Sequence, residues 1–257
     1  MSPCLCILAL AAAPFVDGAR SQHFVLPDEH GEPLAVMTHK RTGDGVKRVF
    51  ESALVWRAGA LVTLQTESVD GQGFKFVHRE LPLAGLGGRT WLAEAHPGEK
   101  VLRFESHCWG APSPRELQFE GTPIGVGGLT AILAAGGRPL ETVWLLDPSS
   151  ASVQGIVLSI FDPAEDPLLL SAASGAIRAA GLSLDSGLLT GFEWRTLEGR
   201  MLRRQVFCAG ELVLFQLQGR QAWARRVSPR MAMRLKRRWT RAQGSGWSSD
   251  LSGGPGS

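Results

Sequence analysis

The sequence lacks the common motifs of catalytic and cofactor-binding sites. Beyond the N-terminal segment it has no Cys-x-x-Cys pair, and its Cys and His spacings match no structural zinc site. None of its six histidines lies four residues from another. The glycine-rich segment 125–128 lacks the third glycine of a dinucleotide loop and the Gly-Lys-Ser/Thr of a phosphate loop. We therefore predict no cofactor, no metal site and no catalytic residues.

Charge is almost absent from the N-terminus. Residues 4–16 form an uncharged apolar run of thirteen residues, too short to cross a bilayer but typical of the core of a signal peptide. Gly18-Ala19 offers a cleavage site, although Met1-Ser2-Pro3 carries no Lys or Arg. We predict a signal peptide at 1–19 and export to the periplasm or cell envelope. The alternative is a buried N-terminal strand or helix in a cytoplasmic protein.

Cysteine is scarce, with four in the chain, and only Cys108 and Cys208 lie outside the predicted signal peptide. In an oxidising compartment they would form one disulfide across a long loop, which would contribute roughly 2–4 kcal/mol to stability. Two unpaired, buried thiols are an equally good interpretation.

One short segment, Ser106-His107-Cys108-Trp109, could hold a nucleophilic cysteine. The surrounding sequence predicts the end of a strand, where neighbouring side chains point to opposite faces. His107 would then point away from Cys108. An enzyme, or an enzyme-accessory domain that uses this pair, is therefore the alternative and not the main prediction.

The residues that are abundant indicate short strands joined by turns. The chain has 31 Gly and 15 Pro, 44% hydrophobic and 20% charged residues. Alternating patterns predict strands, and Asp70-Gly71 marks a hairpin between two of them. The predicted strands span 24–26, 34–39, 46–55, 61–68, 74–80, 90–95, 100–107, 143–148, 153–161, 191–195, 201–208, 211–217 and 222–227.

Two windows predict helices. Residues 124–135 are apolar and end at Gly136-Gly137, and residues 166–182 have Pro167 near their start and Gly181 at their end. Asp162 and Glu165-Asp166 lie in a Pro-rich turn, and either a solvated turn or a helix N-cap explains these carboxylates. Pro112-Ser113-Pro114 interrupts the strand pattern, and 111–123 is the best candidate boundary within a body that no linker divides.

The C-terminal region is strongly basic. Nine basic residues and no acidic ones lie between 220 and 241, which leaves 18 basic and 24 acidic residues elsewhere, a net charge of −6. We predict that 228–257 is a disordered tail, basic and then Gly/Ser-rich. With Trp239, Met231 and Met233 among its arginines, it would contact an anionic membrane surface more readily than nucleic acid, unless it is merely solvated. The candidate contacts are Arg230, Arg234, Lys236, Arg237 and Arg238.

The order of elements resembles a group of exported bacterial proteins of unknown function, similar to lipoprotein-carrier half-barrels. The resemblance lies in a leader, long hairpins, a Pro/Gly stretch that opens an apolar helix, and an ending of Phe192-Glu193-Trp194, Glu198-Gly199-Arg200 and Arg203-Arg204. Arg195-Thr196 departs from the group's usual acidic residue after the tryptophan. The resemblance implies a curved sheet wrapped around a helix, a carrying or scaffolding role in the envelope, and no catalytic residues.

These observations predict one mainly β (β-rich α+β) domain at 20–227, with a curved antiparallel sheet or incomplete barrel and one or two helices. Its apolar concave side would hold a lipid-like ligand or pack a helix. The main functional prediction is a non-enzymatic exported protein that binds or carries an apolar ligand. A structural interaction module is a further alternative.

Overall fold

The structure of the chain is a computed structural model. It describes residues 20–43, 48–57, 62–70, 73–81, 89–95, 101–108, 111–118, 123–137, 142–147, 152–183 and 189–242. The predicted signal peptide at 1–19 and the residues from 243 onward lie outside these ranges.

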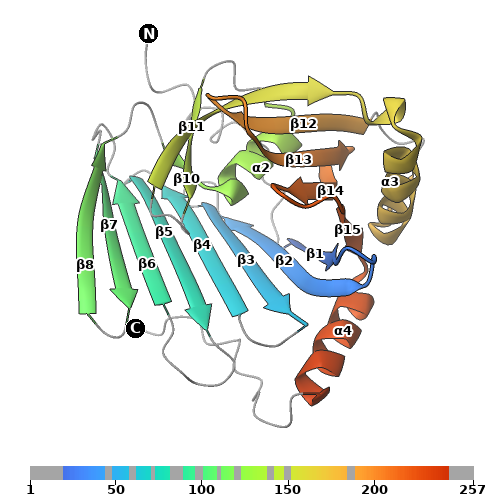
Figure 1. The fold of residues 1–257 in the computed structure, drawn as a ribbon, viewed down its shortest axis with the longest axis horizontal. Coiled ribbons are helices and arrows are strands. Elements are labelled where there is room, and N and C mark those ends of the chain that lie inside the picture. Colours follow the sequence, from blue (N-terminus) through green and yellow to red (C-terminus); the bar gives the residue numbers. More distant parts are fainter. Residues whose placement is uncertain are drawn as a thin grey trace.

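Fifteen strands in the described ranges form one curved sheet, as the sequence predicts (Figure 1). All neighbouring strands are antiparallel except for one parallel pair, β9 and β10. Along the sheet the order is β8-β7-β6-β5-β4-β3-β2-β1-β15-β14-β13-β12-β11-β10-β9.

The first arm of the sheet is a run of eight consecutive antiparallel strands. The first seven of these strands overlap predicted strand segments, and Asp70 pairs with Gly73 at the predicted hairpin. The strands are β1 (Arg20–Pro27), β2 (Pro33–Gly43), β3 (Arg48–Trp56), β4 (Val62–Asp70), β5 (Gly73–Leu81), β6 (Arg89–Ala95), β7 (Val101–Cys108) and β8 (Ala111–Gln118).

The prediction that Pro112-Ser113-Pro114 breaks the strand pattern is wrong, because these residues lie inside β8. Pro112 pairs with His107 and Pro114 with Glu105. β8 lies at the edge of the sheet, where one row of backbone N–H groups has no neighbouring strand. Two prolines spaced two residues apart place their missing N–H groups on the same side, so the ladder to β7 is kept.

The second arm contains the remaining strands and folds across the concave side of the first (Figure 1). It joins the first arm where β15 pairs with β1, with Phe24 opposite Arg226. Its strands are β9 (Pro123–Ile124), β10 (Val143–Asp147), β11 (Ser152–Phe161), β12 (Leu189–Thr196), β13 (Met201–Cys208), β14 (Glu211–Leu217) and β15 (Ala224–Val227).

Helix α2 (Val126–Ala134) fills the space between the two arms. Six consecutive residues, from Gly128 to Leu133, are buried, which is typical of a helix that is apolar all round. It ends as predicted: the N–H of Gly136 donates to Leu133 and that of Gly137 to Ile132, with Gly136 in a left-handed conformation (φ +78°).

Helix α3 (Pro167–Ala179) covers the convex side of the second arm and confirms the second predicted helix. The Asp166 carboxylate accepts hydrogen bonds from the N–H groups of Leu168 and Leu169, so it is the N-cap of the helix, one of the two roles expected for these carboxylates. A single turn of 3-10 helix, η1 (Pro163–Glu165), precedes it and is capped by Asp162. Ala173 and Ile177 pack against strands β13 and β14.

The predicted disordered tail is wrong over its first half, because Pro229–Ala242 form a helix, α4. Ala232, Leu235 and Trp239 recur at helical spacing and pack on the convex face of the first arm. Their partners are Val25, Val36, Val55 and Val227. Three apolar residues among arginines are few, but burial on a preformed sheet stabilises a helix that would be marginal alone.

Candidate ligand-binding site

A cleft lies between α2 and the concave face of the first arm. Its cavity volume is about 60 Å³, and the hollow around it, which includes open solvent, spans about 570 Å³. Strands β1 to β3, one face of α2 and the β13–β14 turn line it. The lining residues are Gln22, 39–41, 50–52, Gly127, Thr130, Ala131, Ala134 and 210–212.

The cleft combines an apolar floor with a polar rim. Phe50, Ala131 and Leu212 are buried and belong to the main apolar core. Lys40 and Glu51 also border the cleft, but their side chains form an ion pair on the opposite, convex face, with 3.2 Å between Nζ and Oε2. The polar rim is centred on Glu211. Glu211 accepts a hydrogen bond from Gln22 at 2.7 Å and forms an ion pair with Arg226 at 2.8 Å. The cleft therefore suits a ligand that has both apolar and polar parts.

Gly210 closes one end of the cleft and could not be replaced by a larger residue without movement. Its φ is +74°, a conformation that favours glycine. A Cβ atom on Gly210 would lie 2.7 Å from the carbonyl oxygen of Ala134 at the end of α2. The absence of a side chain lets the β13–β14 turn approach the helix closely.

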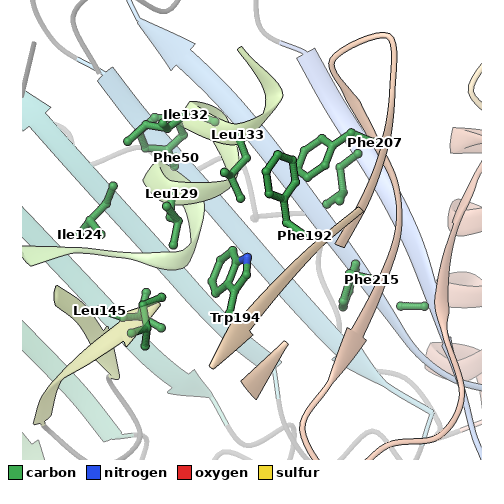
Figure 2. Close-up of a cluster of buried hydrophobic side chains, with 14 of the residues drawn as sticks. Phe50, Ile124, Leu129, Ile132, Leu133, Leu145, Phe192, Trp194, Phe207 and Phe215 are labelled. Atoms are coloured by element: carbon green, nitrogen blue, oxygen red, sulfur yellow. The ribbon is translucent and has the colours of Figure 1, made fainter. Parts of the chain in front are cut away.

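Trp194, on β12, lies at the centre of the apolar core beneath α2. Figure 2 shows it among aromatic and aliphatic side chains from both arms and from the helix. Phe192 and Phe207 meet edge to face, with 5.8 Å between ring centroids. Trp194 is 1% exposed, yet its indole Nε1 has no hydrogen-bond partner among the described residues.

Arg203 places a charged group in this core. It lies on β13 directly opposite Trp194 and is 6% exposed. Its guanidinium carbon lies 4.3 Å from the ring centroid of Phe215 and 5.6 Å from that of Trp194. Nε and Nη2 have no hydrogen-bond partner, and among the described residues no carboxylate forms an ion pair with it. Burial lowers the pKa of Arg203 to about 9, so it remains charged at neutral pH.

His39 joins the cleft to this buried charge. Its ring stacks on Phe215 with 6.3 Å between centroids and lies 5.4 Å from Phe24. Burial, and then the positive charge of Arg203, lower the pKa of His39 to about 3. His39 is therefore neutral at physiological pH, and it lines the cleft without adding a second cation.

Gln205 provides a second link between the cleft and the core. It is fully buried, and its Nε2 donates to Thr130 Oγ1 at 2.9 Å. The Thr130 hydroxyl in turn donates to the carbonyl of Val126 within α2. Gln205 Oε1 has no partner. Arg203, Gln205 and Trp194 thus place several polar atoms without partners on the concave face.

The next residue along β13 shows what a fully paired arginine looks like in this sheet. Arg204 points to the opposite face, where Nε donates to Glu193, and Arg195 donates to the same carboxylate. Burial raises the pKa of Glu193, but the two arginines outweigh this and hold it below its usual value. Arg204 therefore has a carboxylate partner, whereas Arg203, the preceding residue on the same strand, has none among the described residues.

Cys208 is not in a disulfide, which contradicts the first of the two interpretations of the cysteine pair and agrees with the second. Cys208 is a buried, free thiol packed under α3, and burial raises its pKa. Eight strands lie between β7, which carries Cys108, and β13, which carries Cys208. His107 and Cys108 pair with Thr90 and Arg89 at successive positions of β7, and their side chains lie outside the described residues.

The predicted anionic-surface residues separate on α4. Arg230, Arg234, Arg237 and Arg238 are exposed. Lys236 instead turns toward the sheet, where Nζ donates to Thr38 Oγ1 at 2.9 Å and burial lowers its pKa. Trp239 is 6% exposed and Met231 packs beside it, so neither is available to a membrane, whereas Met233 is 51% exposed.

The sequence pattern does not single out Arg203, His39 or Gln205 as site residues. Arg203-Arg204 reads in the sequence only as part of a basic strand. The alternation of β13 does indicate a buried charge. Arg203, Gln205 and Phe207 lie on one face of this strand, and the neighbouring strand presents Phe192 and Trp194 on the same face of the sheet. A charged residue that alternates with apolar core positions along a strand is expected to be buried.

No family model and no curated protein matches this chain. Among solved structures, the chain is similar to a β-barrel-like protein of a domain of unknown function, DUF1849, from Brucella abortus. The two are 12% identical, the alignment covers 84% of this chain and 98% of the other, and the TM-score is 0.42. A likeness of this degree carries no conclusion about ligand or activity.

Neither a metal-binding cluster nor a membrane-spanning helix is found among the described residues. Within them, no three His, Cys, Asp or Glu side chains gather closely enough to hold a metal ion. None of the helices found there has the length and apolar character needed to cross a membrane.

Proposed function

We propose that this protein is a non-enzymatic carrier that binds a lipid-like ligand in the cleft between α2 and the concave face of the sheet. The cleft itself is the observation that carries the proposal. A helix packed tightly against the sheet would leave no opening, whereas here a cavity of about 60 Å³ remains and widens into a hollow open to solvent, where part of a ligand would lie. The floor of Phe50, Ala131 and Leu212 suits an apolar chain, and the charged rim suits a polar head.

The proposal is tested by filling the cleft. Ala134→Trp places a bulky side chain at the cleft lining, and Met233→Trp, on the exposed side of α4, is the matched control. Binding of the neutral fluorescent probe N-phenylnaphthylamine is measured by titration, and circular dichroism checks the fold. We expect about a ten-fold or greater loss of affinity in Ala134→Trp only. Unchanged binding by a folded Ala134→Trp variant would overturn the proposal.

We propose further that the carrier works at the cell envelope and docks on anionic membranes through the exposed face of α4. Arg230, Arg234, Arg237 and Arg238 recur on one side of a helix whose other side is held against the sheet. Each cation near an anionic surface contributes about 1 kcal/mol. The orientation of α4 thus presents several arginines together without any cost of ordering a tail.

Vesicle sedimentation tests this docking. A variant with all four arginines of α4 changed to Gln is compared with a control that loses the same charge elsewhere, at Arg115, Arg178, Arg200 and Arg220. We expect binding to phosphatidylglycerol vesicles to fall at least about ten-fold in the α4 variant, and much less in the control. Equal losses in the two variants would show that net charge alone drives binding and would refute a docking role for α4.

A further inference from the structure

The unpartnered donors in the core have a particular geometry. Nε and Nη2 of Arg203, both without a partner, form one edge of the guanidinium, the edge that binds a carboxylate through two parallel hydrogen bonds. Trp194 Nε1, from the residue directly opposite in the sheet, is a third donor without a partner. Two neighbouring strands therefore supply three hydrogen-bond donors on the same buried face.

A negative charge would satisfy this arrangement better than water. The two aromatic rings beside the guanidinium compensate part of the cost of burying it. Water could accept its hydrogen bonds but would bring no opposite charge, and an unpaired buried ion is strongly unfavourable. Because no carboxylate of the described residues supplies that charge, it is expected to come from a ligand.

The site lies one side chain away from the cleft. Phe215, which Arg203 covers, stacks on His39 of the cleft wall, and Gln205 on the same strand face as Arg203 bonds to Thr130 of the same wall. A head group that passes between His39 and Thr130 would reach Arg203 while its chain stays in the cleft. We propose that Arg203 and Trp194 bind the carboxylate of a long-chain acid, which makes the protein a carrier of anionic rather than neutral lipids.

This inference rests on the proposed ligand-binding function and adds the chemical class of the ligand. A carboxylate carries one negative charge, which one guanidinium neutralises. A phosphate monoester carries close to two at neutral pH. The neutral imidazole of His39 would not compensate the second charge, so the site favours the carboxylate.

The test compares ligands that share a twelve-carbon chain and differ in the head group. Laurate, dodecanol and dodecyl phosphate are titrated against the probe-loaded full chain. Three variants are used: Arg203→Met removes the charge at similar size, Arg203→Lys keeps the charge without the fork, and Arg204→Met is the control on the opposite face. Replacing an unpaired buried charge by an apolar residue is not expected to impair folding.

We expect laurate to displace the probe at about ten-fold or more lower concentration than dodecanol in the natural protein and in Arg204→Met. In Arg203→Met this preference should disappear while dodecanol binds as before, and Arg203→Lys should retain only part of it. The pKa of the bound carboxyl group can be measured from the pH dependence of the NMR shift of ¹³C-carboxyl laurate. This pKa should be lower in the natural protein than in Arg203→Met, because the guanidinium stabilises the ionised carboxylate.

The possible failures are distinguishable. If no ligand displaces the probe, or the probe does not bind, the carrier function itself fails. If laurate and dodecanol bind equally well in every variant, the cleft binds apolar chains but Arg203 does not select the head group. If dodecyl phosphate binds more tightly than laurate and depends on Arg203, the carboxylate assignment is overturned.

Discussion

The two helices that flank the first arm bury themselves in opposite ways. α2 lies on the concave face with six consecutive buried residues and no charged residue, whereas α4 lies on the convex face with arginines around a narrow apolar stripe. The surface of the same strands accepts both. The difference shows that the concave face is an interior, where charge is exceptional, while the convex face needs only partial cover.

The largest expected effect on stability comes from a substitution in α2, on the concave face. Leu129, in α2, is fully buried, so Leu129→Ala should lower the free energy of unfolding by about 2–5 kcal/mol through lost burial and an internal cavity. Urea denaturation followed by fluorescence measures it. The exposed position of α4 is the control, where Met233→Ala should change stability by less than about 0.5 kcal/mol. Similar losses at both positions would show that α2 is not more deeply packed than α4.

Acid should expose a second difference between the faces. The pKa of His39, on the concave face, is lowered to about 3 by burial and Arg203, whereas unfolded histidine titrates near 6.5. Between these values the unfolded state binds more protons, so stability should fall as pH drops from about 6.5 towards about 3. His39→Gln should reduce the loss measured between about pH 7 and pH 4.5 by urea denaturation.

His23, on the convex face beneath α4, provides the comparison for this pH effect. Burial, Lys236 and Arg226 also lower its pKa, so it too should make the protein acid-sensitive. Because its shift is the smaller of the two, His23→Gln should protect less than His39→Gln. A larger effect of His23 would place the more costly protonation on the convex face.

A smaller effect is expected where α4 meets the sheet. Lys236 donates to Thr38, whose hydroxyl lies 3.0 Å from His23 Nδ1. Lys236→Met should change stability by no more than about 1 kcal/mol, since one hydrogen bond is lost and one partly buried charge removed. It should also raise the pKa of His23, measured by NMR titration. An unchanged His23 titration would mean that Lys236 does not lie against the sheet in solution.

The smallest effect is expected on the outer face of α4. Arg234→Gln should alter stability by less than about 0.5 kcal/mol in thermal or urea denaturation, because this side chain is exposed and no ion pair joins it to a described residue. A loss above 1 kcal/mol would show that the arginine face contributes to folding and not to surface binding alone.

Local patterns predicted most of the elements, for identifiable reasons. Gly136 ends helix α2 and Asp166 begins helix α3, and both residues lie next to the helix that they limit. The hairpins are likewise fixed by local turns such as 70–73. The predictions failed where distant partners decide the outcome. β8 tolerates its prolines because it is an edge strand. Helix α4 forms because Leu235 and Trp239 pack against the valines of β1 to β3.

The candidate site was less predictable than the elements. An apolar concave side around a helix was expected, but a strand pattern alone does not say which strands of the two arms face each other. Arg203 becomes a buried charge only because the second arm folds over the first and α2 fills the space between them. That Cys208 stays a free thiol likewise depends on the sheet order, which separates its strand from that of Cys108, and not on the number of cysteines.

By itself, then, the sequence determined a mainly β protein with its strands, turns and two apolar helices, because these depend on residues within a few positions of one another. The tertiary structure alone decided the pairing of β1 with β15, the cleft beside α2 and the isolated charge at Arg203. The physical reason is that burial, and with it the energy of a charge, depends on segments distant in the chain. A ligand site built from β2, α2 and β13 exists only once those segments meet.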